Sequence, residues 1–222
     1  MKSILYSEQK NYLNKFLNVG DKLLTEMEAY AEKFNIPILN KDAALFLEQL
    51  IIIKKPKLVL ELGTAIAYSS IRIARCLIGD GILYSIEKSK SNIAIAKENI
   101  ANSDVKNKII ILEGEAIQIL PSLGKKFDFI FLDSDKKDYE SLFKISFKIL
   151  KKNGIIFIDN LLWHGYAASK NVPLNYKNST EIIRNFNKLF SEYPGLKTSI
   201  LPIGDGIGLG IKLSPKAYKK YE

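Results

Sequence analysis

Three oxygen-bearing side chains follow two apolar stretches of the sequence, and one lysine lies close to them. Asp133 ends the first stretch, and Asp159 and Asn160 end the second. Carboxylate and amide oxygens, with no histidine or cysteine beside them, suit a hard cation: Mg²⁺ first, with Mn²⁺ or Ca²⁺ as alternatives. Lys136 is three residues beyond Asp133. A cation nearby disfavours a second positive charge, so the Lys136 amine could act as a general base towards a hydroxyl group. The alternative for Lys136 is a solvated lysine at a helix start.

A second candidate site is the stretch ELGTAIAYS at residues 61–69, which joins an apolar run to a helical pattern. It has one glycine, Gly63, where a dinucleotide-binding turn has three. A ligand without phosphates explains the difference, since Gly63 still lets the backbone approach closely. Glu87 ends the next apolar run, where an acid accepts hydrogen bonds from ribose hydroxyls. Acids at the strand ends also suit a sulfonium compound such as S-adenosylmethionine; the alternative is that they only cap the following helices.

The elements that must position these residues alternate between apolar runs and helical patterns. Continuous apolar strands separated by helices predict a parallel sheet that is covered on both faces. Two final strands are so close in sequence that only an antiparallel hairpin fits. The expected fold is therefore α/β. Strands are expected at 57–62, 82–87, 108–114, 127–133, 154–160, 197–204 and 206–213, and helices at 67–78, 90–102, 115–123, 136–151 and 178–192.

Five parallel strands followed by a hairpin resemble the Rossmann-like fold of class I S-adenosylmethionine-dependent methyltransferases, which has seven strands. In open α/β sheets ligands bind at the carboxyl ends of the strands, so both candidate sites should meet at one edge of the sheet. Two helices are expected before the first strand, at 18–35 and 41–53, with Asn40 as the N-cap of the second. We expect one apolar face on the first helix, formed by Leu23, Leu24, Met27, Tyr30, Ala31 and Phe34. No linker or repeat is evident, which predicts a single domain over residues 1–222.

The composition of the chain limits the classes of function that it could have. The chain of 222 residues is 47% hydrophobic and 26% charged, as in globular domains. No apolar run is long enough to cross a membrane, and the N-terminus is too polar for a signal peptide. The single cysteine cannot form an internal disulfide. We therefore expect a cytoplasmic protein without a membrane partner. The net charge of +9 favours nucleic acid as a partner, and a general lysine bias is the alternative. Many lysines precede strands and so lie opposite the site, whereas Lys170, Lys177 and Arg184 are expected near it.

Several segments together resemble the cation-dependent O-methyltransferases of the catechol and caffeoyl-CoA type, over about residues 26–212. The segments are ELGTAIAYSSIRIA, LYSIEKS, EGEAIQILP, FDFIFLDSDKKDY, GIIFIDNLLWHG, IIRNFN and LPIGDGIGL. The resemblance implies a metal site of Asp133, Asp159 and Asn160, with Lys136 as the catalytic base. It also implies that S-adenosylmethionine is bound by Leu39, Glu61, Gly63, Ser69, Glu87, Glu115, Ala116 and Asp133. The helices at 18–53 would cover the cofactor and pair two subunits in a homodimer. Such enzymes usually have glycine in place of Ala67, which leaves cofactor affinity open.

Within that family, EAYAEKFNIPIL, GTAIAYS and PIGDGIGLGIK are similar to bacterial tRNA 5-hydroxyuridine methyltransferases. The resemblance implies that the tRNA anticodon loop is the partner and that wobble 5-hydroxyuridine becomes 5-methoxyuridine. Its 5-hydroxyl and 4-carbonyl can chelate one cation, as a catechol does. Trp163, His164 and Tyr166 would stack on a base or, alternatively, pack on their own domain. A small catechol-like phenol is the alternative substrate. A non-catalytic RNA-binding module and an NAD-dependent dehydrogenase are disfavoured.

Overall fold

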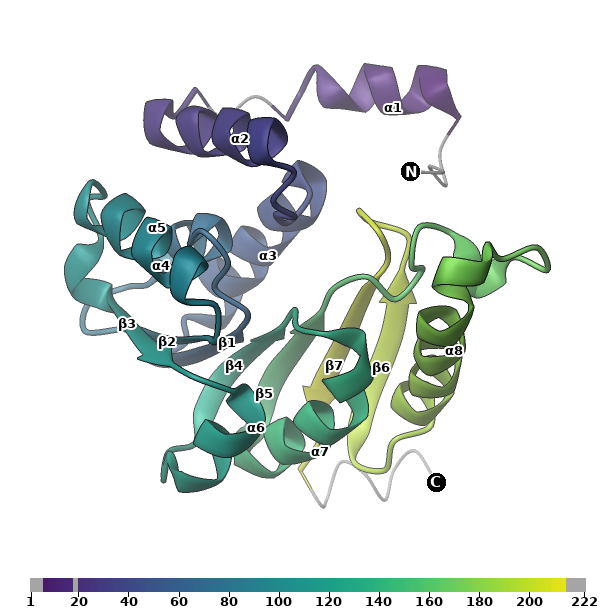
Figure 1. Ribbon diagram of the computed structural model, residues 1–222. Helices are drawn as coiled ribbons and strands as arrows, with labels where there is room; N and C mark the ends of the chain where they lie inside the picture. The colour runs from purple at the N-terminus through teal and green to yellow at the C-terminus, as the bar shows by residue number, and fades with distance from the viewer. Residues whose placement is uncertain (1–5, 18–19, 215–222) are drawn as a thin grey trace.

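The computed structural model describes residues 6–17 and 20–214. It contains a single seven-stranded sheet with helices on both faces (Figure 1). The strand order is β3-β2-β1-β4-β5-β7-β6. Strands β1 to β5 are parallel, and β7 is antiparallel to both of its neighbours. The predicted α/β fold with a terminal hairpin is confirmed. The strands are β1 Leu58–Leu62, β2 Ile82–Glu87, β3 Ile109–Glu113, β4 Phe127–Leu132, β5 Leu150–Ile158, β6 Leu196–Leu201 and β7 Ile207–Lys212.

Eight α-helices are present in the described residues, together with short 3₁₀ turns. The helices are α1 Ser7–Asn14, α2 Lys22–Phe34, α3 Lys41–Lys54, α4 Tyr68–Cys76, α5 Lys90–Ala101, α6 Ala116–Ile119, α7 Tyr139–Ile149 and α8 Lys177–Ser191. Alternate strand residues face opposite sides of the sheet, so the apolar strands build two cores. Val59 belongs to the core that includes residues of α2, α3, α4 and α5, whereas Leu60 belongs to the core that includes residues of α7 and α8. None of the helices within residues 6–17 and 20–214 has the length and apolar character that a bilayer crossing requires.

The N-terminal helices differ from the prediction in two ways. Helix α2 begins at Lys22, because the Asp21 side chain accepts the Leu24 N–H at 2.8 Å and caps the helix; residues 18 and 19 of the predicted helix lie outside the described residues. The apolar face predicted for this helix also included residues that are not buried. Leu24, Met27 and Ala31 are buried, but Tyr30 and Phe34 are exposed and pack on each other instead. Asn40 does occupy the N-cap position of α3, although its side chain makes no capping hydrogen bond.

Two later boundaries were also wrong. The helix expected at 115–123 is only one turn of α-helix followed by a 3₁₀ turn that contains Pro121, since proline cannot donate to an earlier carbonyl. The helix expected at 136–151 starts as a 3₁₀ turn and ends at Ile149, because β5 begins at Leu150. Here Asn153 has a positive φ, and the pairing of β4 with β5 shifts register between Phe127 and Phe129.

The turn between β6 and β7, residues 202–206, connects two segments that are far apart in sequence. The Gly204 N–H donates to the Asp42 carboxylate at 3.0 Å, which ties the turn to the first residues of α3. On the other side, Asp205 accepts the His164 N–H through its side chain at 2.7 Å and the Leu162 N–H through its carbonyl at 2.8 Å. The hairpin therefore fixes the loop that follows β5.

Candidate functional site

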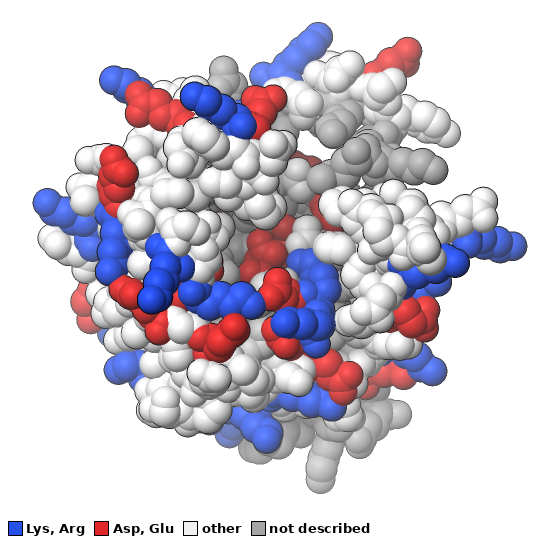
Figure 2. All heavy atoms as spheres, viewed as in Figure 1, with Lys and Arg blue, Asp and Glu red and all other residues white. Residues whose placement is uncertain are grey.

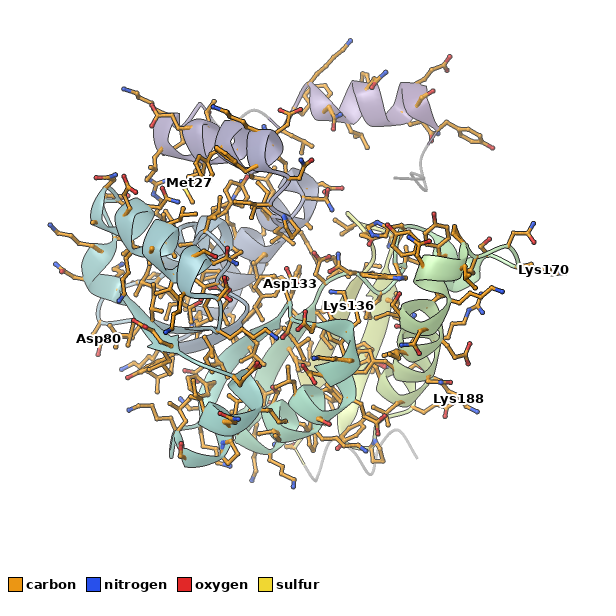
Figure 3. All side chains as sticks on the ribbon, viewed as in Figure 1. Met27, Asp80, Asp133, Lys136, Lys170 and Lys188 are labelled. Atoms are coloured by element: carbon orange, nitrogen blue, oxygen red, sulfur yellow. The ribbon has the colours of Figure 1, made fainter. Side chains whose placement is uncertain are left out.

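The predicted metal-binding and base residues meet where β4 and β5 end. Asp133 follows β4, Lys136 opens the 3₁₀ turn before α7, and Asp159 and Asn160 follow β5. The Lys136 Nζ is 2.6 Å from the Asn160 Oδ1 and 3.5 Å from the Asp133 Oδ1. Figure 3 shows Asp133 and Lys136 close together above the edge of the sheet. The structure thus brings together the residues expected to react, and their roles stay a prediction.

The charges in this cluster are unbalanced. Asp159 is 3% exposed, and burial, with the nearby charge of Asp133, raises its pKa to about 8. Its carboxylate accepts the Asn160 backbone N–H at 2.7 Å. A bound cation would offset the repulsion between the two acids, so the donor set fits a divalent metal ion. In the described part of the chain, no group of three His, Cys, Asp or Glu residues could hold a metal ion. The predicted metal site therefore needs the amide oxygen of Asn160 as its third ligand.

Two further residues of this cluster were missed in the sequence. Tyr139 is fully buried; its hydroxyl donates to the Asp159 carbonyl at 3.1 Å and lies 2.5 Å from the Lys136 Nζ. Burial raises the pKa of Tyr139 well above its ordinary value. Asp205 is also buried and lies 3.5 Å from the Asn160 Nδ2, which leaves the amide oxygen towards Lys136. The i, i+3 spacing of Lys136 and Tyr139 could have indicated the first; Asp205 has no local signal because a distant hairpin supplies it.

Glu61, at the end of β1, lies beneath the loop that was expected to hold the cofactor. It is fully buried, and its Oε1 accepts the Ser69 hydroxyl at 2.6 Å. The Oε2 accepts the hydroxyls of Ser70 and Ser85, the latter at 2.6 Å. Burial is the main reason that the pKa of Glu61 rises to about 7. The carboxylate thus anchors helix α4 to the sheet, and its contact with a cofactor stays a prediction.

Two positions in the β1–α4 loop are constrained by the backbone. Gly63 has φ +107°, and a Cβ built there would lie 1.8 Å from the Asp133 carbonyl oxygen. This glycine is therefore required by the contact between the ends of β1 and β4, whatever ligand approaches it. Ala67 is fully buried with φ +69°, in the left-handed region. Glycine reaches that region without steric cost, which explains why it is usual at this position.

The remaining cofactor candidates lie along the same edge of the sheet. Glu87, the last residue of β2, accepts the Ala65 N–H at 2.9 Å and so holds the loop after β1. Glu115 follows β3, is half-exposed and lies 3.6 Å from the Lys88 Nζ; Ala116 begins α6. Leu39 is buried in the core just before α3. Because the strand order is β3-β2-β1-β4-β5, the cofactor candidates at the strand ends and the predicted metal-binding residues form one row.

Aromatic residues of the loop after β5 stand beside this row. The Lys136 Nζ is 5.4 Å from the centre of the Trp163 ring, and the Trp163 ring is 6.2 Å from that of Tyr176. The rings of Tyr166 and Tyr176 are 5.1 Å apart. All three are only partly buried. Figure 2 shows a hollow in this face of the molecule, with acidic atoms on its floor and basic atoms at its rim. The Trp163 ring thus lies over one side of the Lys136 amine.

The strand order, the antiparallel β7 and the row of strand-end acids define the fold class of S-adenosylmethionine-dependent class I methyltransferases. Residues 17–213 match the family model described as O-methyltransferase, and the chain belongs to that family. It is 32% identical over 189 residues to caffeoyl-CoA O-methyltransferase 1 from Eucalyptus globulus, covering 82% of this chain and 77% of the relative. The predicted family is thereby confirmed.

Solved structures agree with this assignment. A putative caffeoyl-CoA O-methyltransferase from Staphylococcus aureus superposes with a TM-score of 0.86 and 29% identity, covering 93% of this chain and 100% of that chain. An O-methyltransferase from Bacillus cereus in complex with SAH (S-adenosylhomocysteine) gives a TM-score of 0.79 and 26% identity, covering 91% and 96%. The particular likeness to tRNA 5-hydroxyuridine methyltransferases stays a prediction.

Proposed function

We propose that this O-methyltransferase transfers the methyl group of S-adenosylmethionine to the 5-hydroxyl of wobble 5-hydroxyuridine in tRNA, in a Mg²⁺-dependent reaction. The observation that carries the proposal is the Lys136 cluster: one amine within reach of Asp133 and Asn160, beside a half-exposed aromatic loop. Such a cluster can deprotonate a hydroxyl while an adjacent ring is held in place.

Asp133, Asp159 and Asn160 would hold the cation. When bound, the cation would polarise two adjacent oxygens of the substrate and lower the pKa of its hydroxyl. Lys136 would accept the hydroxyl proton. S-adenosylmethionine would supply the methyl group: the substrate oxygen would bond to the methyl carbon as the carbon–sulfur bond breaks, and the electron pair of that bond would stay on sulfur. Tyr139 orients the lysine by its hydroxyl, and Trp163 covers the amine from the other side.

A small catechol-like phenol is the second candidate substrate. The observation that favours it is the similarity to caffeoyl-CoA O-methyltransferases, whose name describes a catechol-bearing acyl group. A catechol, like 5-hydroxyuridine, presents two neighbouring oxygens to one cation. The same residues would perform the transfer in either case, so only the region around the aromatic loop distinguishes the two substrates.

The test supplies the purified enzyme with S-adenosylmethionine and Mg²⁺, and with either tRNA carrying 5-hydroxyuridine or a simple catechol. We expect 5-methoxyuridine in the nucleoside digest, detected by mass spectrometry. An enzyme carrying Asp133→Ala and Asp159→Ala is the matched control and should form no product. Turnover of the catechol without any 5-methoxyuridine would show that the tRNA assignment is wrong and that the second candidate holds.

A further inference from the structure

A cavity of about 780 Å³ lies between the loop after β5 and the first turn of α8, and the transfer reaction does not use it. Its lining includes the polar and charged residues Lys170, Lys177, Asn178, Thr180, Glu181 and Arg184. Figure 3 shows Lys170 at the outer end of this loop, well separated from Lys136. A ligand that fills the cavity is therefore distinct from the reacting group, although one long substrate can reach both.

The cavity is basic. Lys170 and Lys177 are exposed, and neither forms a hydrogen bond or ion pair with any residue of 6–17 or 20–214. Arg184 donates to the carbonyls of Ala167 at 3.0 Å and Ser169 at 2.5 Å, so it holds the wall of the cavity in shape. The one acid, Glu181, is 3.8 Å from the Arg184 guanidinium and is offset by it. The two unpaired lysines thus leave a net positive charge for a ligand to neutralise.

The aromatic residues link this cavity to the reacting group. Trp163 faces Lys136, Tyr176 lies next to it, and Lys177 follows Tyr176 directly in the chain. The Trp163 Nε1 donates to the Ser179 hydroxyl at 2.9 Å, which fixes the ring against the start of α8. Aromatic faces that continue into a basic groove are how proteins bind single-stranded nucleic acid without base-specific contacts.

We propose that this cavity binds backbone phosphates of single-stranded RNA next to the nucleotide whose base lies at Lys136. The inference rests on the proposed function, because it concerns the same substrate. A simple phenol has no group that could reach Lys170 while its hydroxyl is at Lys136. The cavity is therefore a specificity feature for a substrate that carries phosphates at a distance from the methylated oxygen.

The experiment measures binding of a fluorescent short oligouridylate by anisotropy over a range of salt concentrations. Three full-length proteins are compared: the wild type, Lys170→Ala with Lys177→Ala, and Lys152→Ala with Lys188→Ala. The last pair is a matched control, because both lysines are exposed and lie outside the cavity. We expect the slope of log K against log salt to fall by about 1.4 in the cavity variant, as for two lost phosphate contacts with a single strand, and to stay unchanged in the control.

An equal change in both double variants, or no change in either, would overturn the proposal. Coenzyme A is a competing probe: if it displaces the oligouridylate at much lower concentration than free RNA does, the cavity holds a nucleotide tail and the RNA assignment is wrong. The assay needs neither cofactor nor modified uridine. RNA binding that depends on the cavity lysines, without methyl transfer, would therefore overturn the proposed function alone.

Discussion

The row of strand-end acids has two halves that are satisfied in opposite ways. On the cofactor half, Glu61 accepts three serine hydroxyls and Glu87 accepts backbone N–H groups of the adjacent loops. On the acceptor half, Asp133 and Asp159 face each other with Lys136 as the basic side chain between them. The first half is complete within the protein, whereas the second is balanced only when a further positive charge is present.

The difference shows which half the substrates must complete. Hydroxyl groups that already bond to a carboxylate fix the loop geometry before any ligand arrives, so the cofactor half is preorganised. A buried carboxylate that is repelled by a second acid raises the free energy of the unliganded protein, and a cation that binds between the two relieves this repulsion. We therefore expect changes in the acceptor half to affect activity and changes in the cofactor half to affect stability.

The largest expected effect comes from removing charge in the acceptor half. Asp159→Ala should lower methyl transfer by at least about 100-fold, because it removes an oxygen donor of the candidate metal site. EDTA should cause a comparable loss in the wild type, and Mg²⁺ should restore it. Thermal unfolding gives an independent measurement: Mg²⁺ should raise the Tm of the wild type and not that of the variant.

Asp80→Asn is the control, since Asp80 is exposed and distant from the site in Figure 3. It should keep both the activity and the response of the Tm to Mg²⁺. If the wild type stays active in EDTA, the metal assignment is wrong. The proposed difference between the cofactor half and the acceptor half is then wrong as well.

The second effect concerns the base. Lys136→Ala should lower kcat by about 10²- to 10⁴-fold, as for the loss of a general base. Calorimetric binding of S-adenosylmethionine should change little, because Asp133 is the one cofactor candidate among the described residues that pairs with the lysine. Lys137→Ala is the matched control at an exposed adjacent position. Equal kcat values for the two variants would exclude Lys136 as the base.

The third effect tests the cofactor half through the pH dependence of stability. Burial raises the pKa of Glu61 from 4.5 to about 7, so the folded state binds its proton more tightly than the unfolded state. The resulting stabilisation is complete below the unfolded pKa and is lost as the pH rises through 7. The wild type should therefore lose about 3 kcal/mol relative to Glu61→Gln between these pH values.

Urea denaturation of both proteins at several pH values in EDTA measures this difference directly. Other titrating groups, including Asp159, contribute to both proteins and cancel in the comparison. A difference that does not change with pH would mean that Glu61 is ionised in the folded protein at a normal pKa.

The smallest effect is expected at Ala67. Ala67→Gly relieves the steric cost of a positive φ but adds backbone entropy to the unfolded chain, so the free energy of unfolding should change by less than about 1 kcal/mol. Ala67→Val places a β-branched residue in the same conformation and should cost more than about 2 kcal/mol. Thermal melts of both variants check this order; a glycine variant as unstable as the valine variant would contradict the explanation from φ.

Much of this architecture could be predicted from the sequence, because it depends on local patterns. The parallel strands, the hairpin and the meeting of Asp133, Lys136, Asp159 and Asn160 follow from apolar runs and strand ends. The early start of β5 could not be predicted, since Lys151, Lys152 and Asn153 are poor strand formers and lie in an irregular stretch between two pairs with β4, Leu150 with Phe127 and Ile155 with Phe129. Neighbouring strands decided the structure there.

Contacts between segments that are distant in the chain also could not be predicted from the sequence. Tyr30 and Phe34 continue the helical periodicity of α2, yet nothing in the described chain covers them as a core would. Arg72, on α4, is 1% exposed because Glu48 on α3 accepts its Nε at 2.7 Å and Tyr68 accepts its Nη1. Burial of an arginine contradicts its usual preference and becomes predictable only once its partners are known.

The β6–β7 turn has a consequence for synthesis of the protein. Asp205 and Gly206 hold the backbone N–H groups of Leu161, Leu162 and His164, and Gly204 holds the start of α3 through Asp42. These contacts join residues that leave the ribosome early to residues that leave it late. A nascent chain can form the first five strands, but the loop beside Lys136 gains its fixed position only after the hairpin has emerged. Premature termination before residue 204 therefore produces a chain with every predicted catalytic side chain and an unfinished site.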